Sequence, residues 1–286
     1  MQIGKLSLEQ ILKISVFDKG KIKLGFWGFL FGALTYFIFQ GLAINFAQDN
    51  NIQAIVLALG DFLASLFFIA TIVALSLAVK GSLGGKKKEL KIKDSLKQGA
   101  DYLPKFIGII ILYMLAILLA GILGRGLFFL GTIPMWGALI LGMGTLPLTA
   151  FFLYFIVTVI LGIKLLPAFL INEKGSVWEL FVKLNKMIVS KVVQIATYSV
   201  LGFLVGIPLA AMLVFIFGSA SYITAWVQKA VFQQILLSGG MIEWPVVLFG
   251  LFSGVSYLLV TVLAATFLAT YVVTALYSIY LAVKTK

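Results

Sequence analysis

The chain contains no cysteine and no histidine among its 286 residues. Without cysteine it has no disulfide, no thiolate nucleophile and no cysteine-ligated zinc or iron–sulfur site. Without histidine it lacks the usual haem ligand and the base of serine–histidine and cysteine–histidine catalytic pairs. We therefore expect a protein that is not an enzyme and that has no cofactor and no metal site.

Charged residues are also scarce, because they make up 11% of the chain while hydrophobic residues make up 62%. Soluble globular proteins have about 25% charged and about 45–50% apolar residues. A formal net charge of +12 would indicate a nucleic-acid surface in a soluble domain. A chain this apolar is instead solvated by a lipid bilayer, so we expect an integral membrane protein that does not bind nucleic acid.

Six apolar stretches are long enough to cross a membrane, which takes about 20 residues in a helix. We therefore predict an all-α fold, with residues 1–286 forming one membrane domain of six transmembrane helices. The predicted spans are residues 24–46, 54–79, 106–130, 138–163, 192–217 and 246–283. The last stretch is longer than the hydrocarbon thickness requires, which indicates tilt or extension beyond the lipid.

Positive charge is distributed unevenly between the two sides of the predicted membrane. All but Arg125 and Lys229 of the 22 lysines and arginines lie before the first span, after the second and fourth spans, or at the C-terminus. Cytoplasmic loops carry the excess of lysine and arginine. We therefore expect a multi-pass protein of a prokaryotic cytoplasmic (inner) membrane, with both termini and the basic loop 80–105 in the cytoplasm.

A serine opens the short polar stretch before each outward span, at Ser7, Ser95 and Ser176. Ser7 and Gln10 match a capping box, which predicts the start of a helix. The repeated pattern predicts three helical hairpins, each introduced by a cytoplasmic interfacial helix. Residues 1–23 are the first of these interfacial segments.

The stretch 176–191 predicts the best-formed interfacial helix, because its polar and apolar residues fall on opposite faces at helical spacing. The polar face has Glu179, Lys183, Lys186 and Ser190, and the apolar face has Val177, Phe181, Leu184 and Ile188. Such a helix lies along the membrane with its lysines toward anionic headgroups. Two alternatives stay open: a plain anchor that holds the bundle at its depth, and a docking site for a cytoplasmic partner.

Lysines of the basic loop and of this helix are the candidate contacts to anionic lipid or to a partner protein: Lys86, Lys87, Lys88, Lys183, Lys186 and Lys191. On the opposite side, residues 219–244 are too polar to cross the membrane and too apolar for a free loop. We expect them to form an outer interfacial or re-entrant helix.

Asp61 is the only acidic residue well inside a predicted span. A carboxylate in the membrane needs a partner, water or a proton, so Asp61 is a candidate functional group. Arg125 is predicted at a similar depth, near the outer end of the third span. Three hypotheses stay open: an ion pair between the two, proton or ion coupling by Asp61, and contact of Asp61 with outer water.

Hydroxyl residues recur at every fourth position of the last span: Thr266, Thr270, Thr274 and Ser278. Such a stripe either lines a polar path or bonds back to the preceding turn of its own helix.

Glycine pairs at GxxxG spacing occur in three spans and predict close packing between helices. The pairs are Gly28 with Gly32, Gly202 with Gly206, and Gly250 with Gly254.

Residues 95–106 (SLKQGADYLPKF) and 165–191 (LLPAFLINEKGSVWELFVKLNKMIVSK) lead into the third and fifth spans. Here the chain resembles a poorly characterised group of prokaryotic membrane proteins, which includes the membrane domain of some bacterial glycerophosphodiester phosphodiesterases. In that group a proline and a small residue, here Pro167 and Ala168, lead through a polar turn with Glu173 into an amphipathic helix. The resemblance implies a six-helix bundle without chemistry of its own, and the phosphodiesterase domain is absent here.

The sequence favours a non-enzymatic membrane protein with a membrane-organising or transport-related role, whose basic cytoplasmic face engages anionic lipid. One alternative is the membrane subunit of an ABC-type exporter with a cytoplasmic ATPase as its partner, because the number of spans and the element between the second and third match that architecture. The other is a proton- or ion-coupled carrier that uses Asp61. Each of these is compatible with a homo-oligomer.

Overall fold

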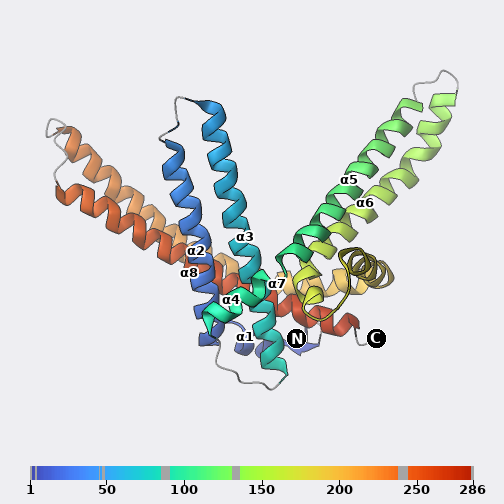
Figure 1. Cartoon of the computed structure of the whole chain (residues 1–286), viewed down its shortest axis with the longest axis horizontal. Helices are drawn as coiled ribbons and strands as arrows, with labels where there is room; N and C mark the ends of the chain where they lie inside the picture. Colours follow the sequence, from blue (N-terminus) through green and yellow to red (C-terminus); the bar gives the residue numbers. More distant parts are fainter. Residues whose placement is uncertain are drawn as a thin grey trace.

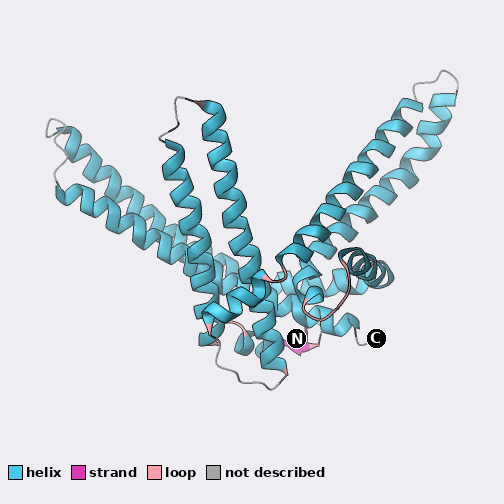
Figure 2. Cartoon of the chain, viewed as in Figure 1, coloured by secondary structure: helices cyan, strands magenta, loops and turns pink. Residues whose placement is uncertain are grey.

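The structure is a computed structural model that describes residues 2–3, 5–44, 46, 49–84, 91–130, 136–237 and 244–284. Side chains are described for residues 5–44, 46, 49–84, 91–126, 129, 149–208, 210–211 and 254–284. Helices make up nearly all of the described chain (Figure 2). They are α1 (Leu8–Ile14), α2 (Lys19–Ile44), α3 (Asn50–Leu83), α4 (Ile92–Ala100), α5 (Leu103–Leu130), α6 (Trp136–Leu170), α7 (Val177–Leu237) and α8 (Trp244–Lys284). A short antiparallel strand pair, β1 (Gln2–Ile3) and β2 (Leu6–Ser7), precedes α1.

Six helices of the described chain are long and apolar enough to cross a membrane. They are α2, α3, α5, α6, α7 and α8, and each of them overlaps one predicted span. The predicted all-α class is confirmed, and so is the predicted number of helices long and apolar enough to span a membrane. This fold is compatible with a multi-pass membrane protein. The predicted capping box is also present, since Ser7 and Gln10 exchange hydrogen bonds at the start of α1.

Helix α6 continues beyond the predicted end of the fourth span at residue 163 and reaches Leu170. Lys164 does not end the helix, because lysine is a good helix former. The chain turns only in the segment that contains Gly175, whose φ of 151° is a conformation that favours glycine.

The structure differs from the prediction in one part of residues 219–244, of which residues 238–243 lie outside the described residues. Residues 219–237 continue α7 as one helix, where we expected a separate outer interfacial or re-entrant element. No glycine or proline occurs between residues 219 and 237 to stop the helix, and α7 ends just before Gly239 and Gly240. Its non-helical residue is Lys191 (φ −136°, ψ 23°), where α7 bends between the predicted interfacial helix and the span.

Consecutive long helices lie side by side in three pairs, α2 with α3, α5 with α6, and α7 with α8 (Figure 1). The pairs come together at one end of the molecule and diverge toward the other. We call the joined end the base, defined as residues 5–30, 70–84, 91–113, 158–199 and 262–284. The diverging remainder of each pair is an arm. Both chain termini lie at the base.

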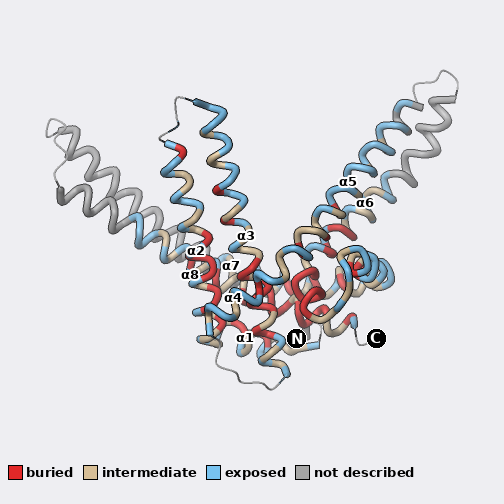
Figure 3. The backbone as a smooth tube through the Cα atoms, viewed as in Figure 1, coloured by how far each residue is buried: buried red, intermediate tan, exposed pale blue. Residues whose placement is uncertain are grey.

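The hydrophobic core lies in the base (Figure 3). Of the described buried hydrophobic side chains, all but Ala43 and Ala64 belong to it. Short helices complete this core: α1 buries Ile11 completely, and α4 places Gly99 directly against the backbone carbonyl of Ala70 on α3. A side chain at position 99 would overlap that carbonyl, so glycine permits α4 to dock.

The described arm residues expose large apolar side chains, among them Phe37, Ile38, Phe62, Leu119 and Ile156. In water such continuous apolar surface would drive aggregation. A bilayer covers it without cost, because lipid chains are as apolar as the side chains themselves. The arms therefore have the surface of lipid-exposed helices, while the base has the interior of a folded domain.

Candidate functional site

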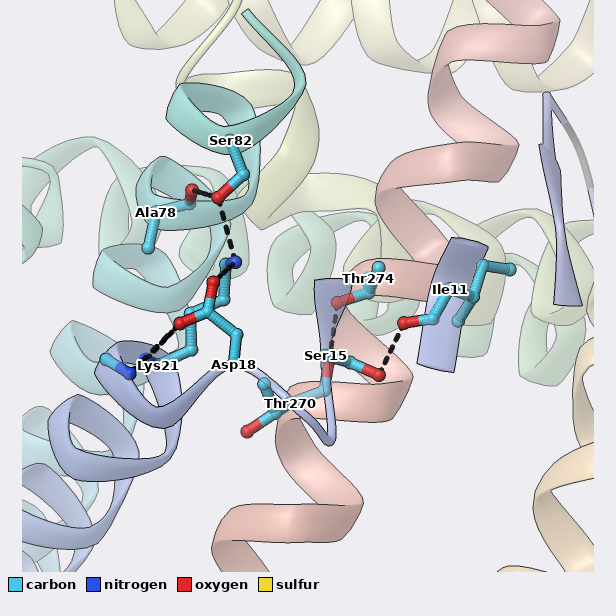
Figure 4. A network of polar contacts seen from close by, with 9 residues as sticks. Ile11, Ser15, Asp18, Lys21, Ala78, Ser82, Thr270 and Thr274 are labelled. Carbon is cyan, nitrogen blue, oxygen red and sulfur yellow. Dashed lines mark hydrogen bonds and ion pairs between the residues drawn. The ribbon is translucent and has the colours of Figure 1, made fainter. Parts of the chain in front are cut away.

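Lys21, in the first turn of α2, is a fully buried cation in the base (Figure 4). Its Nζ donates to Asp18 Oδ2 at 2.5 Å and to Ser82 Oγ at 2.8 Å. Asp18 Oδ1 also accepts the N–H groups of Gly20 and Lys21, so Asp18 caps α2. Burial raises the pKa of the Asp18 carboxyl, but the hydrogen bonds and charge of Lys21 outweigh it and leave the pKa below its ordinary value. Lys21 therefore ties the start of α2 to the end of α3 through Ser82, and Asp18 supplies its counterion.

A second polar cluster joins the turn after α6 to the end of α8. Glu173 Oε1 accepts a hydrogen bond from Lys284 Nζ at 2.6 Å and another from the Tyr280 hydroxyl at 3.1 Å. The hydrogen bond from Lys284 lowers the pKa of the Glu173 carboxyl below its ordinary value. Glu173 therefore stays charged at neutral pH and holds the C-terminal end of α8 in place.

Two further lysines bind backbone carbonyls at helix ends. Lys80 Nζ donates to the carbonyl of Ile171 at 2.6 Å, just after α6, and Lys191 Nζ donates to the carbonyl of Val283 in the last turn of α8. The last carbonyls of a helix have no partner within it, and cations are favourable there. Lys191, which we expected to contact lipid or a partner, thus makes an internal contact in the base.

The first part of α7, residues 177–190, presents three distinct faces. Leu180, Leu184 and Ile188 are fully buried against the base. The predicted polar face is exposed at each of its members, Glu179, Lys183, Lys186 and Ser190. Between these two faces runs an exposed apolar stripe that the sequence analysis did not identify: Trp178 (63% exposed), Val182 (46%) and Val189 (50%). The reciprocal hydrogen bonds of Ser176 and Glu179 fix the start of this helix.

Exposed lysines of the described chain all lie on the base, including Lys93 and Lys97 on α4 and Lys183 and Lys186 on α7. Lys86, Lys87 and Lys88 lie outside the described residues. The base is therefore the basic end of the molecule, and the described arms contribute only Arg125 as an exposed cation.

The hydroxyl stripe of α8 is buried inside the base. Thr266, Thr270 and Thr274 each donate a hydrogen bond to the carbonyl four residues earlier. Ser278 Oγ accepts hydrogen bonds from two backbone N–H groups of the N-terminal segment. All four residues are fully buried, and the Thr266 methyl group packs against Gly25. The threonine hydroxyls therefore bond back to their own helix, which was one of the two predicted alternatives for this stripe.

The structure does not bring Asp61 and Arg125 together. Both are exposed, Asp61 on the α2–α3 arm and Arg125 on the α5–α6 arm, and these arms diverge (Figure 1). No ion pair joins them in the described part of the chain, where the two ion pairs are Lys21–Asp18 and Lys284–Glu173. The carrier hypothesis that rests on Asp61 stays a prediction.

The glycine pairs occupy different environments. Gly28 and Gly32 face α3, where an added Cβ would lie 2.2 Å from Thr71 Oγ1 and 2.4 Å from Phe68, respectively. Gly202 is buried beside Tyr271, and an added Cβ on Gly206 would lie 3.1 Å from the same ring. Gly254 is exposed with nothing within 4 Å of such a Cβ, and the side-chain environment of Gly250 lies outside the described part. Close packing is thus observed for the first two pairs.

Comparison of the chain with models of known protein families, with curated proteins and with solved structures gave no match. The resemblance to the membrane domain of bacterial phosphodiesterases and the exporter hypothesis therefore stay predictions.

Proposed function

We propose that this chain is a non-enzymatic protein of a prokaryotic cytoplasmic membrane, and that it organises the membrane by gathering anionic lipid at its basic base. In this proposal the base lies at the cytoplasmic surface, the three helix pairs are membrane hairpins, and both termini are cytoplasmic. The observation that carries the proposal is the three-faced helix at the start of α7.

This helix has the surface that an interfacial helix needs. One face is fixed to the base by Leu180, Leu184 and Ile188, which are fully buried. The exposed stripe of Trp178, Val182 and Val189 is suited to enter the boundary between headgroups and acyl chains, where tryptophan is favoured.

Lys183 and Lys186 are placed to attract anionic headgroups, because they are exposed on the face adjoining that apolar stripe. Each lysine near an anionic surface contributes about 1 kcal/mol of attraction. The remaining exposed lysines of the base extend the same positive potential around it. In the proposal α1 and α4 are the other two interfacial helices, and they hold the base at the same depth.

The proposal can be tested with the full chain in vesicles that contain phosphatidylcholine and a minor amount of fluorescent phosphatidylglycerol. Energy transfer from the protein tryptophans to the labelled lipid reports how much anionic lipid surrounds the protein. We expect stronger transfer to phosphatidylglycerol than to phosphatidylcholine with the same label. Replacing both lysines, Lys183→Gln with Lys186→Gln, should reduce this preference by up to about thirtyfold, because the two lysines together contribute about 2 kcal/mol.

The matched control is Arg125→Gln, which removes an exposed cation from the α5–α6 arm instead of from the base and so should leave the lipid preference unchanged. Equal transfer to both lipids in the wild-type protein would contradict the proposal. So would a preference for phosphatidylglycerol that persists unchanged in the double lysine variant.

A further inference from the structure

Helices α7 and α8 enclose a groove at the junction of their arm with the base. Its volume is about 360 Å³ and its lining is almost wholly apolar. Small residues on α7 create the space, since Gly202, Gly206 and Ala210 lie one turn apart and face Tyr271 and Ala275 on α8. The Tyr271 hydroxyl donates to the carbonyl of Gly202 at 3.1 Å, which fixes the ring as one wall of the groove.

The groove opens on the surface that the arms present to lipid. Phe203 and Ile207, which line it, are 55% and 57% exposed. From Ser199 to Ala210 it follows α7 for about 16 Å at 1.5 Å per residue. That length is about half of the roughly 30 Å hydrocarbon thickness of a bilayer, so it matches the acyl chain of one leaflet.

Ser199 lines the base end of the groove with a hydroxyl that has no partner. The residue is 9% exposed, and its Oγ makes no hydrogen bond in the structure. Other span hydroxyls of this chain, such as those of Thr197 and Ser76, donate to the carbonyl four residues earlier. A buried hydroxyl without a partner is costly, and a ligand oxygen at this position would satisfy it.

Lys164 of α6 supplies a cation at the same groove. Its ammonium lies 4.5 Å from the centre of the Phe203 ring, and Phe203 is one helical turn beyond Ser199. No carboxylate of the described residues lies within 4.0 Å of this ammonium. An unpaired ammonium in a membrane-spanning segment is costly, and an anion beside it removes much of that cost.

We infer that the groove is a binding site for one anionic phospholipid of the bilayer. One acyl chain occupies the apolar groove along α7, and the phosphate group is held by the Lys164 ammonium and the Ser199 hydroxyl. The inference requires that the chain lies in a membrane, but it does not depend on Lys183 and Lys186. A partner helix would match the apolar lining alone, whereas a phospholipid also matches the cation and the unpaired hydroxyl at one end.

The test uses the full chain in phosphatidylcholine vesicles with a small fraction of one photoactivatable lipid, which carries a diazirine on its acyl chain. The headgroup is phosphatidylglycerol in one sample and phosphatidylcholine in the other, with identical chains. After illumination, mass spectrometry of peptides locates the adducts. We expect phosphatidylglycerol to label residues 199–210 and 268–279 about fivefold to tenfold more than phosphatidylcholine does, as one charged contact provides.

Lys164→Met keeps the apolar stem and removes the charge, so the phosphatidylglycerol yield in these segments should fall to the phosphatidylcholine yield. Ser199→Ala should reduce it by a smaller factor, and Lys97→Gln, an exposed lysine of α4, should leave it unchanged. Equal yields from the two lipids in the wild-type protein, which needs no variant, would overturn the inference. Adducts confined to other segments would overturn it as well. The lipid preference of the Lys183 and Lys186 double variant, measured by energy transfer, bears only on the proposed function.

Discussion

Asp18→Asn is expected to lower the free energy of unfolding by about 3–5 kcal/mol, the cost of leaving a buried charge without its counterion. Lys21 is fully buried, and Asp18 is its only carboxylate partner in the described chain. Asparagine is as good an N-cap as aspartate, so the cap on α2 is kept while the negative charge is lost. Because the Asp18 side chain is 32% exposed, we expect a value near the lower end of this range.

Asp49→Asn is the matched control for this effect. Asp49 caps α3 through the N–H groups of Asn51 and Ile52, in the same way that Asp18 caps α2, but it is exposed and forms no ion pair with any described residue. It should change the free energy of unfolding little. Both variants are measured by denaturant titration of the purified chain in mixed micelles.

A compensating variant separates loss of charge from general damage. Asp18→Asn combined with Lys21→Met removes both charges and keeps the apolar stem, and such replacements are often neutral or stabilising. We expect the double variant to recover most of the lost stability. If Asp18→Asn and Asp49→Asn had the same small effect, the Asp18 carboxylate would not be the counterion that stabilises the buried Lys21 charge.

Gly28→Ala is expected to lower the free energy of unfolding by about 1–3 kcal/mol, the usual cost of inserting a methyl group into a packed interface. The new Cβ would lie 2.2 Å from Thr71 Oγ1 and 2.6 Å from Thr71 Cγ2, so α2 and α3 must separate. In an unpacked helical position the same change is favourable by about 0.5–1 kcal/mol, because alanine is the better helix former.

Gly41→Ala, on the same helix, provides that unpacked position, since nothing lies within 4 Å of a Cβ added there. The two substitutions should therefore have opposite signs in the same denaturant titration. Thr71→Ala removes the two overlapping atoms and leaves its own Cβ at 3.0 Å, so it should partly rescue Gly28→Ala. Equal effects at positions 28 and 41 would show that α2 and α3 are not in the close contact described here.

The elements of this fold could be predicted from the sequence because each depends on local properties. Apolar length predicts the six spanning helices, and the capping residues Ser7 and Ser176 predict where α1 and α7 begin. The polar face of residues 177–190 follows from helical spacing in the same way. Residues 219–237 were predicted to be helical, but their continuity with the fifth span was missed because their polar residues suggested a separate element.

The arrangement of these elements could not be predicted, because lipid supplies no hydrophobic force that selects one pairing of apolar helices. The sequence predicts a similar membrane depth for Asp61 and Arg125. In the structure they lie on two arms that diverge. Lys164 was placed at the end of a span, whereas it lies within α6 beside Phe203 of another helix. The buried Ser199 hydroxyl has no hydrogen-bond partner in the structure, which no sequence pattern reveals.

The central claim is that the base and the outer ends of the arms lie on opposite sides of a membrane. The chain has no cysteine, so single cysteines can be introduced without background. Lys97→Cys places a thiol on exposed α4 of the base, and Asn51→Cys places one at the exposed outer end of α3. With an impermeant thiol reagent added to intact cells, Asn51→Cys should be labelled at once and Lys97→Cys only after the membrane is permeabilised. Labelling of both positions in intact cells would contradict the account.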